Sequence, residues 1–126
     1  MRLVVALILR DVVLSIFGAT ASLRGGSGYA AFSSAKAGLR MVARAMAREL
    51  GPQNIHVAHL VIDAGVDTSF VRERIKAARG EEALATMPED ALMNPVSIAN
   101  AYWALHQQTR DAWTFELDLR PYGEAW

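Results

Sequence analysis

A long helical pattern between two short apolar runs constrains the fold most. Residues 29–50 are rich in alanine and long-chain side chains and contain no proline. Their apolar residues recur at the three- and four-residue steps of an amphipathic helix, at Leu39, Val42, Met46 and Leu50. Gly51 and Pro52 end this helix. Residues 12–17 and 55–62 are continuous apolar runs, typical of strands buried on both faces of a parallel sheet. The sequence therefore predicts a strand–helix–strand unit.

The rest of the chain continues this alternation. Residues 69–78 favour a second helix, and Asn94 is a plausible N-cap for a third, with Pro95 at its first position. Residues 113–119 alternate apolar and polar side chains, which indicates a strand near a sheet edge. Strand, helix, strand, helix, strand is the pattern of an α/β layer. We expect a small, mostly parallel sheet flanked by helices.

Composition narrows the possible functions. The 126 residues suffice for a single domain, 1–126, and 52% of them are hydrophobic. Thirteen basic residues balance thirteen acidic ones, which argues against a nucleic-acid-binding protein, because such proteins neutralise phosphates. The sequence has no cysteine, so disulfides and thiolate metal sites are excluded.

The first residues resemble a signal peptide only loosely. They have a basic start, an apolar run over residues 3–9 and a small-x-small triplet at 19–21. Arg10 and Asp11 interrupt the run, and seven apolar residues are too few to span a membrane. We interpret this segment as one buried strand or two short ones. We therefore expect a cytoplasmic protein that does not bind membranes.

Three segments carry a resemblance to a known family. They are "GYAAFSSAKAGLR" at 28–40, "ELGPQNIHV" at 49–57 and "VDT" at 66–68. From about Val12 onward the chain resembles the C-terminal half of a short-chain dehydrogenase/reductase. The resemblance implies a partial Rossmann-like layer and an NAD(P)-dependent oxidoreductase of unknown substrate. The family's T-G-x-x-x-G-x-G turn for the cofactor pyrophosphate has no equivalent here, so we expect the N-terminal dinucleotide-binding half to be absent.

The resemblance also implies where the site residues lie. The family's catalytic tyrosine, the general acid, falls at Phe32, and its serine, thirteen positions earlier, falls at Ala19. The family's lysine, which tunes the tyrosine and holds the nicotinamide ribose, is retained as Lys36. The threonine that contacts the nicotinamide amide is retained as Thr68, whereas Asp63 and Ala64 stand in place of Pro-Gly. This combination resembles a divergent subgroup with phenylalanine in place of tyrosine.

These replacements leave two hypotheses for the function. Phe32 has no titratable proton, so it cannot act as a general acid, and it is expected to pack into a pocket wall. Tyr29 does not replace it, because a residue seven positions from Lys36 on a helix lies about 10 Å away. Lys36 either binds a ribose or lays its stem on the sheet with its ammonium at carbonyls or water. The chain is then either a catalytically impaired oxidoreductase or a non-catalytic remnant that assembles or binds a small ligand.

Other clusters carry less chemistry. His56 and His59 are three apart on a strand, so they point to opposite faces and do not chelate one metal. No metal site is predicted. Arg40, Arg44 and Arg48 form a stripe that we interpret as a solvated helix face.

The C-terminal region carries all three tryptophans of the chain. Aromatic residues and arginine are enriched at interface hot spots. In the family this region and the long helix build subunit interfaces. We therefore expect a homo-oligomer that associates through helix 29–50 and through the C-terminal helix and strand.

Overall fold

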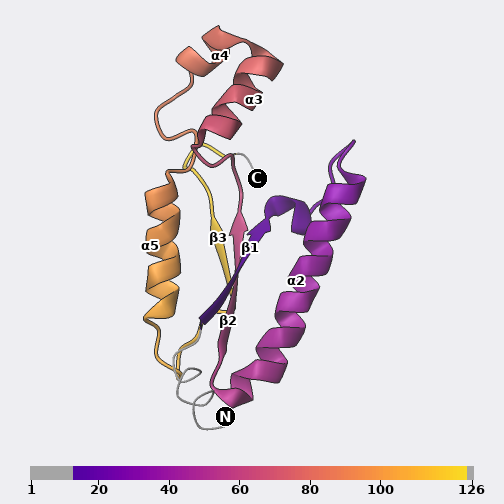
Figure 1. Cartoon of the computed structure of the whole chain (residues 1–126), viewed down its shortest axis with the longest axis vertical. Coiled ribbons are helices and arrows are strands. Elements are labelled where there is room, and N and C mark those ends of the chain that lie inside the picture. The colour runs from indigo at the N-terminus through magenta and orange to yellow at the C-terminus, as the bar shows by residue number, and fades with distance from the viewer. Residues whose placement is uncertain (1–12, 125–126) are drawn as a thin grey trace.

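Three parallel strands form the centre of the protein (Figure 1). The computed structural model describes residues 13–124. The strands are β1 (Val13–Ala19), β2 (His56–Ile62) and β3 (Glu116–Leu119), in the order β1-β2-β3. Both neighbouring pairs are parallel, with His59 opposite Ile16 on β1 and Glu116 on β3. The predicted α/β fold with a small parallel sheet is confirmed.

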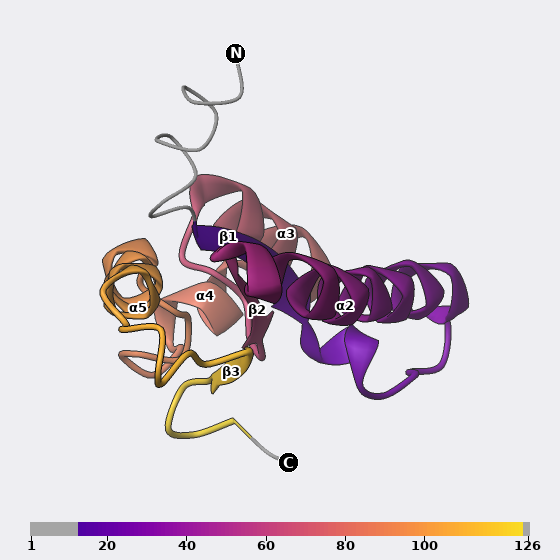
Figure 2. The same ribbon diagram turned by 90° about the horizontal axis from the view of Figure 1, so that it is seen from below.

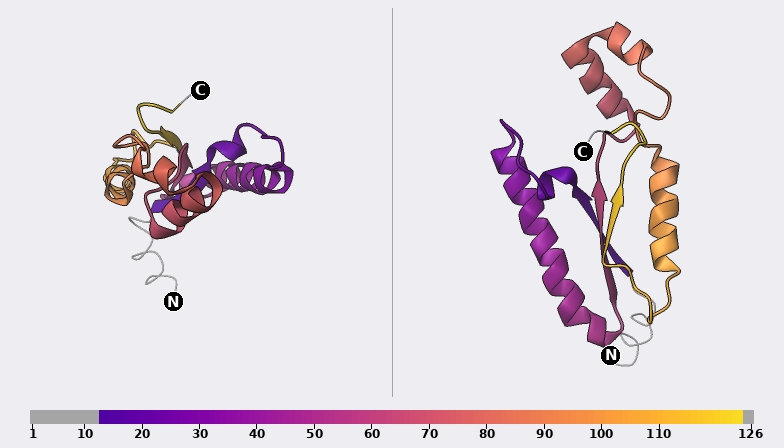
Figure 3. Two further views of the ribbon diagram at one scale, coloured as in Figure 1. Left: turned by 90° about the horizontal axis from the view of Figure 1, so that it is seen from above. Right: turned by 180° about the vertical axis from the view of Figure 1, so that it is seen from behind.

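Helices cover both faces of the sheet and extend beyond its carboxyl end. Helix α2 (Ala30–Leu50) lies on one face and α5 (Pro95–His106) on the other, as the end-on view shows (Figure 2). Helices α3 (Ser69–Arg79) and α4 (Glu81–Ala85) lie past the strand ends (Figure 3). Two single-turn 3-10 helices, η2 (Thr20–Ser22) and η3 (Gly51–Gln53), follow β1 and α2.

The middle strand, β2, is the core of the fold. Every residue of β2 is buried, which confirms the prediction of a strand covered on both faces for residues 55–62. The same prediction is wrong for β1, which is an edge strand with Ser15 and Phe17 exposed. The alternate β2 residues Ala58, Leu60 and Ile62 pack in one cluster with Ile98 and Leu105 of α5. Partly buried residues close this cluster: Val66, Met93, Ala101, Tyr102, Leu117 and Leu119.

Side-chain N-caps fix the first residues of α5 and α3. Asn94 accepts from the backbone N–H of Val96 at 2.8 Å, which confirms it as the N-cap of α5. Thr68 caps α3 in the same way, because its hydroxyl oxygen accepts from the N–H of Val71 at 3.2 Å. Helix α4 was not expected from the sequence and begins directly after Gly80, which has φ +89°.

Two strand boundaries differ from the sequence prediction by two residues or more. Strand β1 continues to Ala19, two residues beyond the apolar run 12–17 that predicts it. Strand β3 begins at Glu116 rather than at residue 113, because the Gln108 side chain takes the place of a strand partner at Thr114. Gln108 Oε1 accepts from the Thr114 N–H at 2.7 Å, and Gln108 Nε2 donates to Thr114 Oγ1 at 2.8 Å.

The predicted signal-like segment and the start of the first strand, residues 1–12, lie outside the described residues. Within residues 13–124, no helix has both the length and the apolar character needed to cross a membrane.

Candidate functional site

The carboxyl end of the sheet brings the predicted site residues to the same end of the molecule. In open parallel α/β sheets, ligands bind beyond the carboxyl ends of the strands. Ala19 is the last residue of β1 and the N-cap of η2, with extended backbone angles of φ −148° and ψ 157°. Thr68 lies a few residues beyond β2, where it caps α3. The N-terminal half of α2, which carries Phe32 and Lys36, packs beside β1 and η2 (Figure 1).

Lys36 is held among aromatic rings. Its Nζ lies 5.7 Å from the ring centroid of Phe32 and 5.8 Å from that of Phe17 on β1. An ammonium within about 6 Å of a ring is attracted by the ring's quadrupole. Phe32 is 48% exposed rather than packed into a pocket wall, and its ring meets the edge of Tyr29 at 6.4 Å between centroids. Lys36 and Phe32, which the resemblance predicts to share one site, therefore lie side by side on α2.

Ala19 and Thr68 are less closely tied to this pair. Ala19 supplies no hydroxyl, and none of the described hydrogen bonds joins Thr68 to Lys36 or Phe32. Thr68 Oγ1 is an acceptor for α3, so its hydroxyl hydrogen is its donor toward a ligand. The structure thus pairs Lys36 with Phe32 and places Ala19 at the end of β1 and Thr68 at the start of α3.

A buried carboxylate network, which the sequence analysis missed, joins the three strand ends. Asp63 follows β2 and is 5% exposed. Thr20 Oγ1 donates to Asp63 Oδ1, and Arg120 Nη1 lies 3.1 Å from Asp63 Oδ2. Arg24, whose side chain is 55% exposed, lies 3.8 Å from Oδ1. The Asp63 N–H donates to the Leu119 carbonyl at 2.9 Å, so Asp63 binds groups from both neighbouring chain segments.

A second missed network ties α2 to the sheet. Arg40 donates two hydrogen bonds to Glu116, from Nε at 2.7 Å and from Nη2 at 2.6 Å. His59 Nδ1 lies 3.1 Å from Glu116 Oε2, and because a carboxylate only accepts, Nδ1 carries the hydrogen. Bonding to Arg40 lowers the pKa of Glu116, against a smaller opposing effect of burial, and the bond to Glu116 raises the pKa of Arg40.

This network corrects the interpretation of the arginine stripe. Arg40 is not solvated, because its side chain is 20% exposed and bonded to Glu116. Arg44 lies with its guanidinium carbon 5.6 Å from the ring centroid of Phe115. Only Arg48 is exposed as expected for a solvated face. Both missed networks carried a weak signal, a carboxylate directly after or within an apolar strand pattern.

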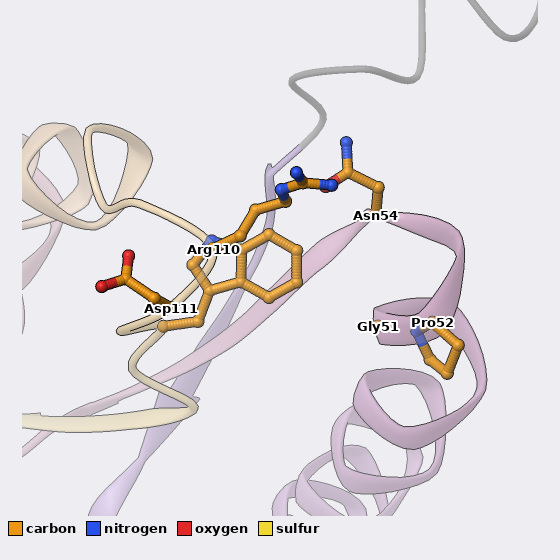
Figure 4. A pocket seen from close by; sticks show the side chains of 6 residues that line it. Gly51, Pro52, Asn54, Arg110 and Asp111 are labelled. Atoms are coloured by element: carbon orange, nitrogen blue, oxygen red, sulfur yellow. The ribbon is translucent and has the colours of Figure 1, made fainter.

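Several cavities lie away from the site residues. One of about 360 Å³ lies near the amino end of β2, lined by Gly51, Pro52, Asn54, Arg110, Asp111 and Trp113. In it the Arg110 side chain is directed toward Asn54 (Figure 4). A second cavity of about 330 Å³ lies between the second half of α2 and Phe115. A third of about 180 Å³ lies between the start of β2 and the segment before β3. A fourth of about 230 Å³ lies beside α3 and α4. None of these four is lined by Ala19, Phe32, Lys36 or Thr68.

The part of the chain that the structure describes has no cluster of side chains that could bind a metal ion. Over residues 13–124, no three His, Asp or Glu side chains are grouped so that they could hold one ion. His56 is instead stacked on Trp113, with 4.9 Å between ring centroids, and its Nε2 lies 2.7 Å from the Thr114 carbonyl oxygen.

Comparison with known proteins identifies the class. Residues 11–115 match the family model described as enoyl-(acyl carrier protein) reductase. A short-chain dehydrogenase from Rhodopseudomonas palustris is 47% identical, with a TM-score of 0.64 over 96% of this chain and 42% of that one. The chain belongs to the short-chain dehydrogenase/reductase family. No match was found among curated proteins.

Two more distant structures share the fold. A closed form of serine dehydrogenase complexed with NADP+ is 16% identical, with a TM-score of 0.69 over 90% of this chain and 46% of that one. An NADPH-bound short-chain oxidoreductase from Pseudomonas aeruginosa PAO1, described as containing an atypical catalytic centre, is 21% identical, with a TM-score of 0.67 over 86% and 44%. The chain therefore spans less than half the length of these solved relatives.

Proposed function

We propose that the chain corresponds to the C-terminal half of an NAD(P)-dependent oxidoreductase and is catalytically impaired as it stands. The observation that carries the proposal is the contact between Lys36 and Phe32. The lysine that the family uses at the nicotinamide is kept and lies 5.7 Å from the ring that replaces the proton donor. The rest of the site supports binding better than proton transfer, because neither Phe32 nor Ala19 has an exchangeable side-chain proton.

The residues present fit one end of the cofactor. No ion pair within residues 13–124 engages Lys36, so its three N–H donors suit the hydroxyls of a nicotinamide ribose. Thr68 would contribute its hydroxyl at the carboxamide. When bound, the cofactor supplies the hydride. The sequence has no T-G-x-x-x-G-x-G turn for the pyrophosphate, so this chain offers the nicotinamide end of a site and not its phosphate end.

A non-catalytic function is the second candidate, and exposed apolar side chains favour it. Met41 and Val42 on α2 are each 52% exposed, and Val96 and Trp103 on α5 are 65% and 59% exposed. Such residues suit association of identical chains through both helices. In this reading the chain is an assembly domain, or a binder of a small ligand beside Ala19, Phe32 and Thr68.

Titration with NADH and NADPH tests the proposal. We expect saturable quenching or enhancement of the dihydronicotinamide fluorescence, weakened at least severalfold in Lys36→Met and unchanged in Lys76→Met. Lys76 is a suitable control because it is paired with Glu81 on an exposed surface at 3.0 Å. Binding that is absent, or equal in both variants, would favour the assembly domain.

A further inference from the structure

The network of Arg40, Glu116 and His59 is a closely bonded group of polar side chains that the proposed function does not use. The His59 side chain is fully buried, and the side chains of Arg40 and Glu116 are 20% and 24% exposed. Removing such charges from water is costly unless their bonds are well formed. Here Glu116 accepts from two elements at once, α2 and β2.

The network lies one helical turn from the site. Phe32, Lys36 and Arg40 are four residues apart along α2, so each is offset from the last by about 40° around the helix and about 6 Å along it. The three side chains therefore form one stripe. Any rotation of α2 about its axis that breaks the Arg40 bonds also moves Lys36 relative to the sheet.

The form of the contact restricts that rotation. A guanidinium that binds a carboxylate through Nε and Nη2 together is fixed in a plane, whereas a lysine ammonium would bind as a single point. Glu116 is in turn held by His59, which is buried in the middle strand. The contact thus fixes both partners, one on the helix and one on the sheet.

Lys36 needs such an external constraint. Its described contacts are with the rings of Phe17 and Phe32, and a half-exposed ring gives little directional control. We propose that Arg40, Glu116 and His59 are positioning residues that orient α2 so that the Lys36 ammonium is held between Phe17 and Phe32. The orientation of Lys36 does not depend on the proposed function; only the identity of the ligand that Lys36 binds does.

Amine labelling of Lys36 tests the inference directly. Lys36 and Lys76 are the two lysines of the sequence, so Lys76 serves as an internal standard in every sample. The parent chain and its Arg40→Lys variant would be dimethylated with limiting formaldehyde and a borohydride, and peptides quantified by mass spectrometry. We expect the ratio of Lys36 to Lys76 labelling to rise about twofold to fivefold in the variant, the size of one lost cation–π contact.

Two further variants separate orientation from stability. Arg48→Lys makes the same chemical change on an exposed part of the same helix, and we expect it to leave the ratio unchanged. Arg40→Met combined with Glu116→Gln removes both charges, and we expect it to be more stable than Arg40→Met alone, because no unpaired carboxylate is left. It does not restore the two bonds, so the raised Lys36 ratio should persist. Circular dichroism and thermal melting report the stability of each variant.

Three results would overturn the inference. One is a parental labelling ratio in folded Arg40→Lys and in the folded double variant. Another is an equal rise in Arg48→Lys. The third is loss of the fold in Arg40→Lys, which would show that the network holds the whole sheet rather than orienting Lys36. Each of these readings is independent of nicotinamide binding, so failure of the proposed function would be seen separately in the fluorescence titration.

Discussion

Gly18 and His59 lie so close together that no side chain fits between their strands. A Cβ built on Gly18 would lie 2.3 Å from His59 Nε2, 2.6 Å from His59 Cε1 and 2.8 Å from the Leu60 carbonyl oxygen. The His59 ring is fully buried and fixed by Glu116, so it has no room to move away. The glycine at this place is therefore required by packing.

Gly18→Ala is expected to lower the free energy of unfolding by about 3 kcal/mol, at the upper end of the cost of overpacking a core. Chemical denaturation with urea measures it. Gly38→Ala is the matched control, because a Cβ there meets nothing within 4 Å and the residue lies inside α2. That control should gain about 0.5–1 kcal/mol from its higher helix propensity. Equal effects of the two substitutions would contradict the role of His59.

The sheet could be predicted from the sequence because its middle strand, β2, is a continuous apolar run. This strand is buried along its whole length, and the stop at Gly51 and Pro52 separates it from α2. Both patterns involve residues that are close in sequence, so hydrophobic periodicity along the chain is enough to predict the strand and the helix. The predicted end of β1 and start of β3 are wrong because each depends on contacts distant in sequence. These are the pairing of Gly18 and Ala19 with β2 and the bonds of Gln108 to Thr114.

The site was predictable only in part for the same reason. Lys36 and Phe32 are one turn apart, so their proximity follows from helix geometry alone. Glu116 and Arg40 are 76 residues apart, and spacing gives no sign of a bond between them. The spacing of Arg40, Arg44 and Arg48 predicts a solvated helix face, because such charge patterns are common on exposed faces. Only the tertiary fold shows that two of its three members meet Glu116 and Phe115.

Acid should remove the stabilisation that Glu116 provides. Its pKa is lowered in the folded chain, chiefly by the bonds from Arg40, below the ordinary value of 4.5. A lowered pKa means that the unfolded chain binds a proton first as the pH falls. The contribution of Glu116 is therefore complete above about pH 4.5 and is lost as the pH falls through the lower folded value.

The variant Glu116→Gln separates the stabilisation by ionised Glu116 from that by the other carboxylates of the chain. At pH 7 we expect the variant to be less stable than the parent by about 1–2 kcal/mol, the range for a charge-assisted bond that is partly exposed. Urea denaturation at a series of pH values should show the difference shrinking below about pH 4.5. A difference that stays constant from pH 7 to pH 3 would mean that ionised Glu116 adds nothing to stability.

Restoring the missing hydroxyls should reveal whether the site is otherwise intact. The parent is expected not to reduce carbonyls. Phe32→Tyr with Ala19→Ser supplies a general acid and a second hydroxyl at the same end of the sheet, and acid catalysis contributes about 10²–10⁴-fold. We expect NADPH oxidation with a small aldehyde or ketone to rise by that order above the parent rate, followed at 340 nm.

The Lys36 contact decides how such a gain is interpreted. Adding Lys36→Met to the double variant should abolish the gain, because the lysine lies 5.7 Å from the ring at position 32. Adding Lys76→Met should leave it unchanged, since Lys76 pairs with Glu81 on α4. Turnover by the parent that depends on Lys36 would show that the chain is not impaired.

The last prediction is that identical chains associate through α2 and α5. Val42 and Trp103 are 52% and 59% exposed, a high fraction for large apolar residues on helices that cover a sheet. We expect sedimentation equilibrium to give a mass above the 13.7 kDa of one chain, rising with concentration. Val42→Glu and Trp103→Glu should each raise the dissociation constant by 10-fold or more, about 1.4 kcal/mol, because each would bury a charge at an interface.

Phe70 on α3 provides the control for these two variants. It is 67% exposed, which is more than either, but it lies on neither of the two helices that cover the sheet. Phe70→Glu should therefore leave the dissociation constant unchanged. A parent that sediments as a single chain at every concentration would rule out self-association. If only Phe70→Glu weakened it, the interface would lie at α3, beyond the carboxyl end of the sheet.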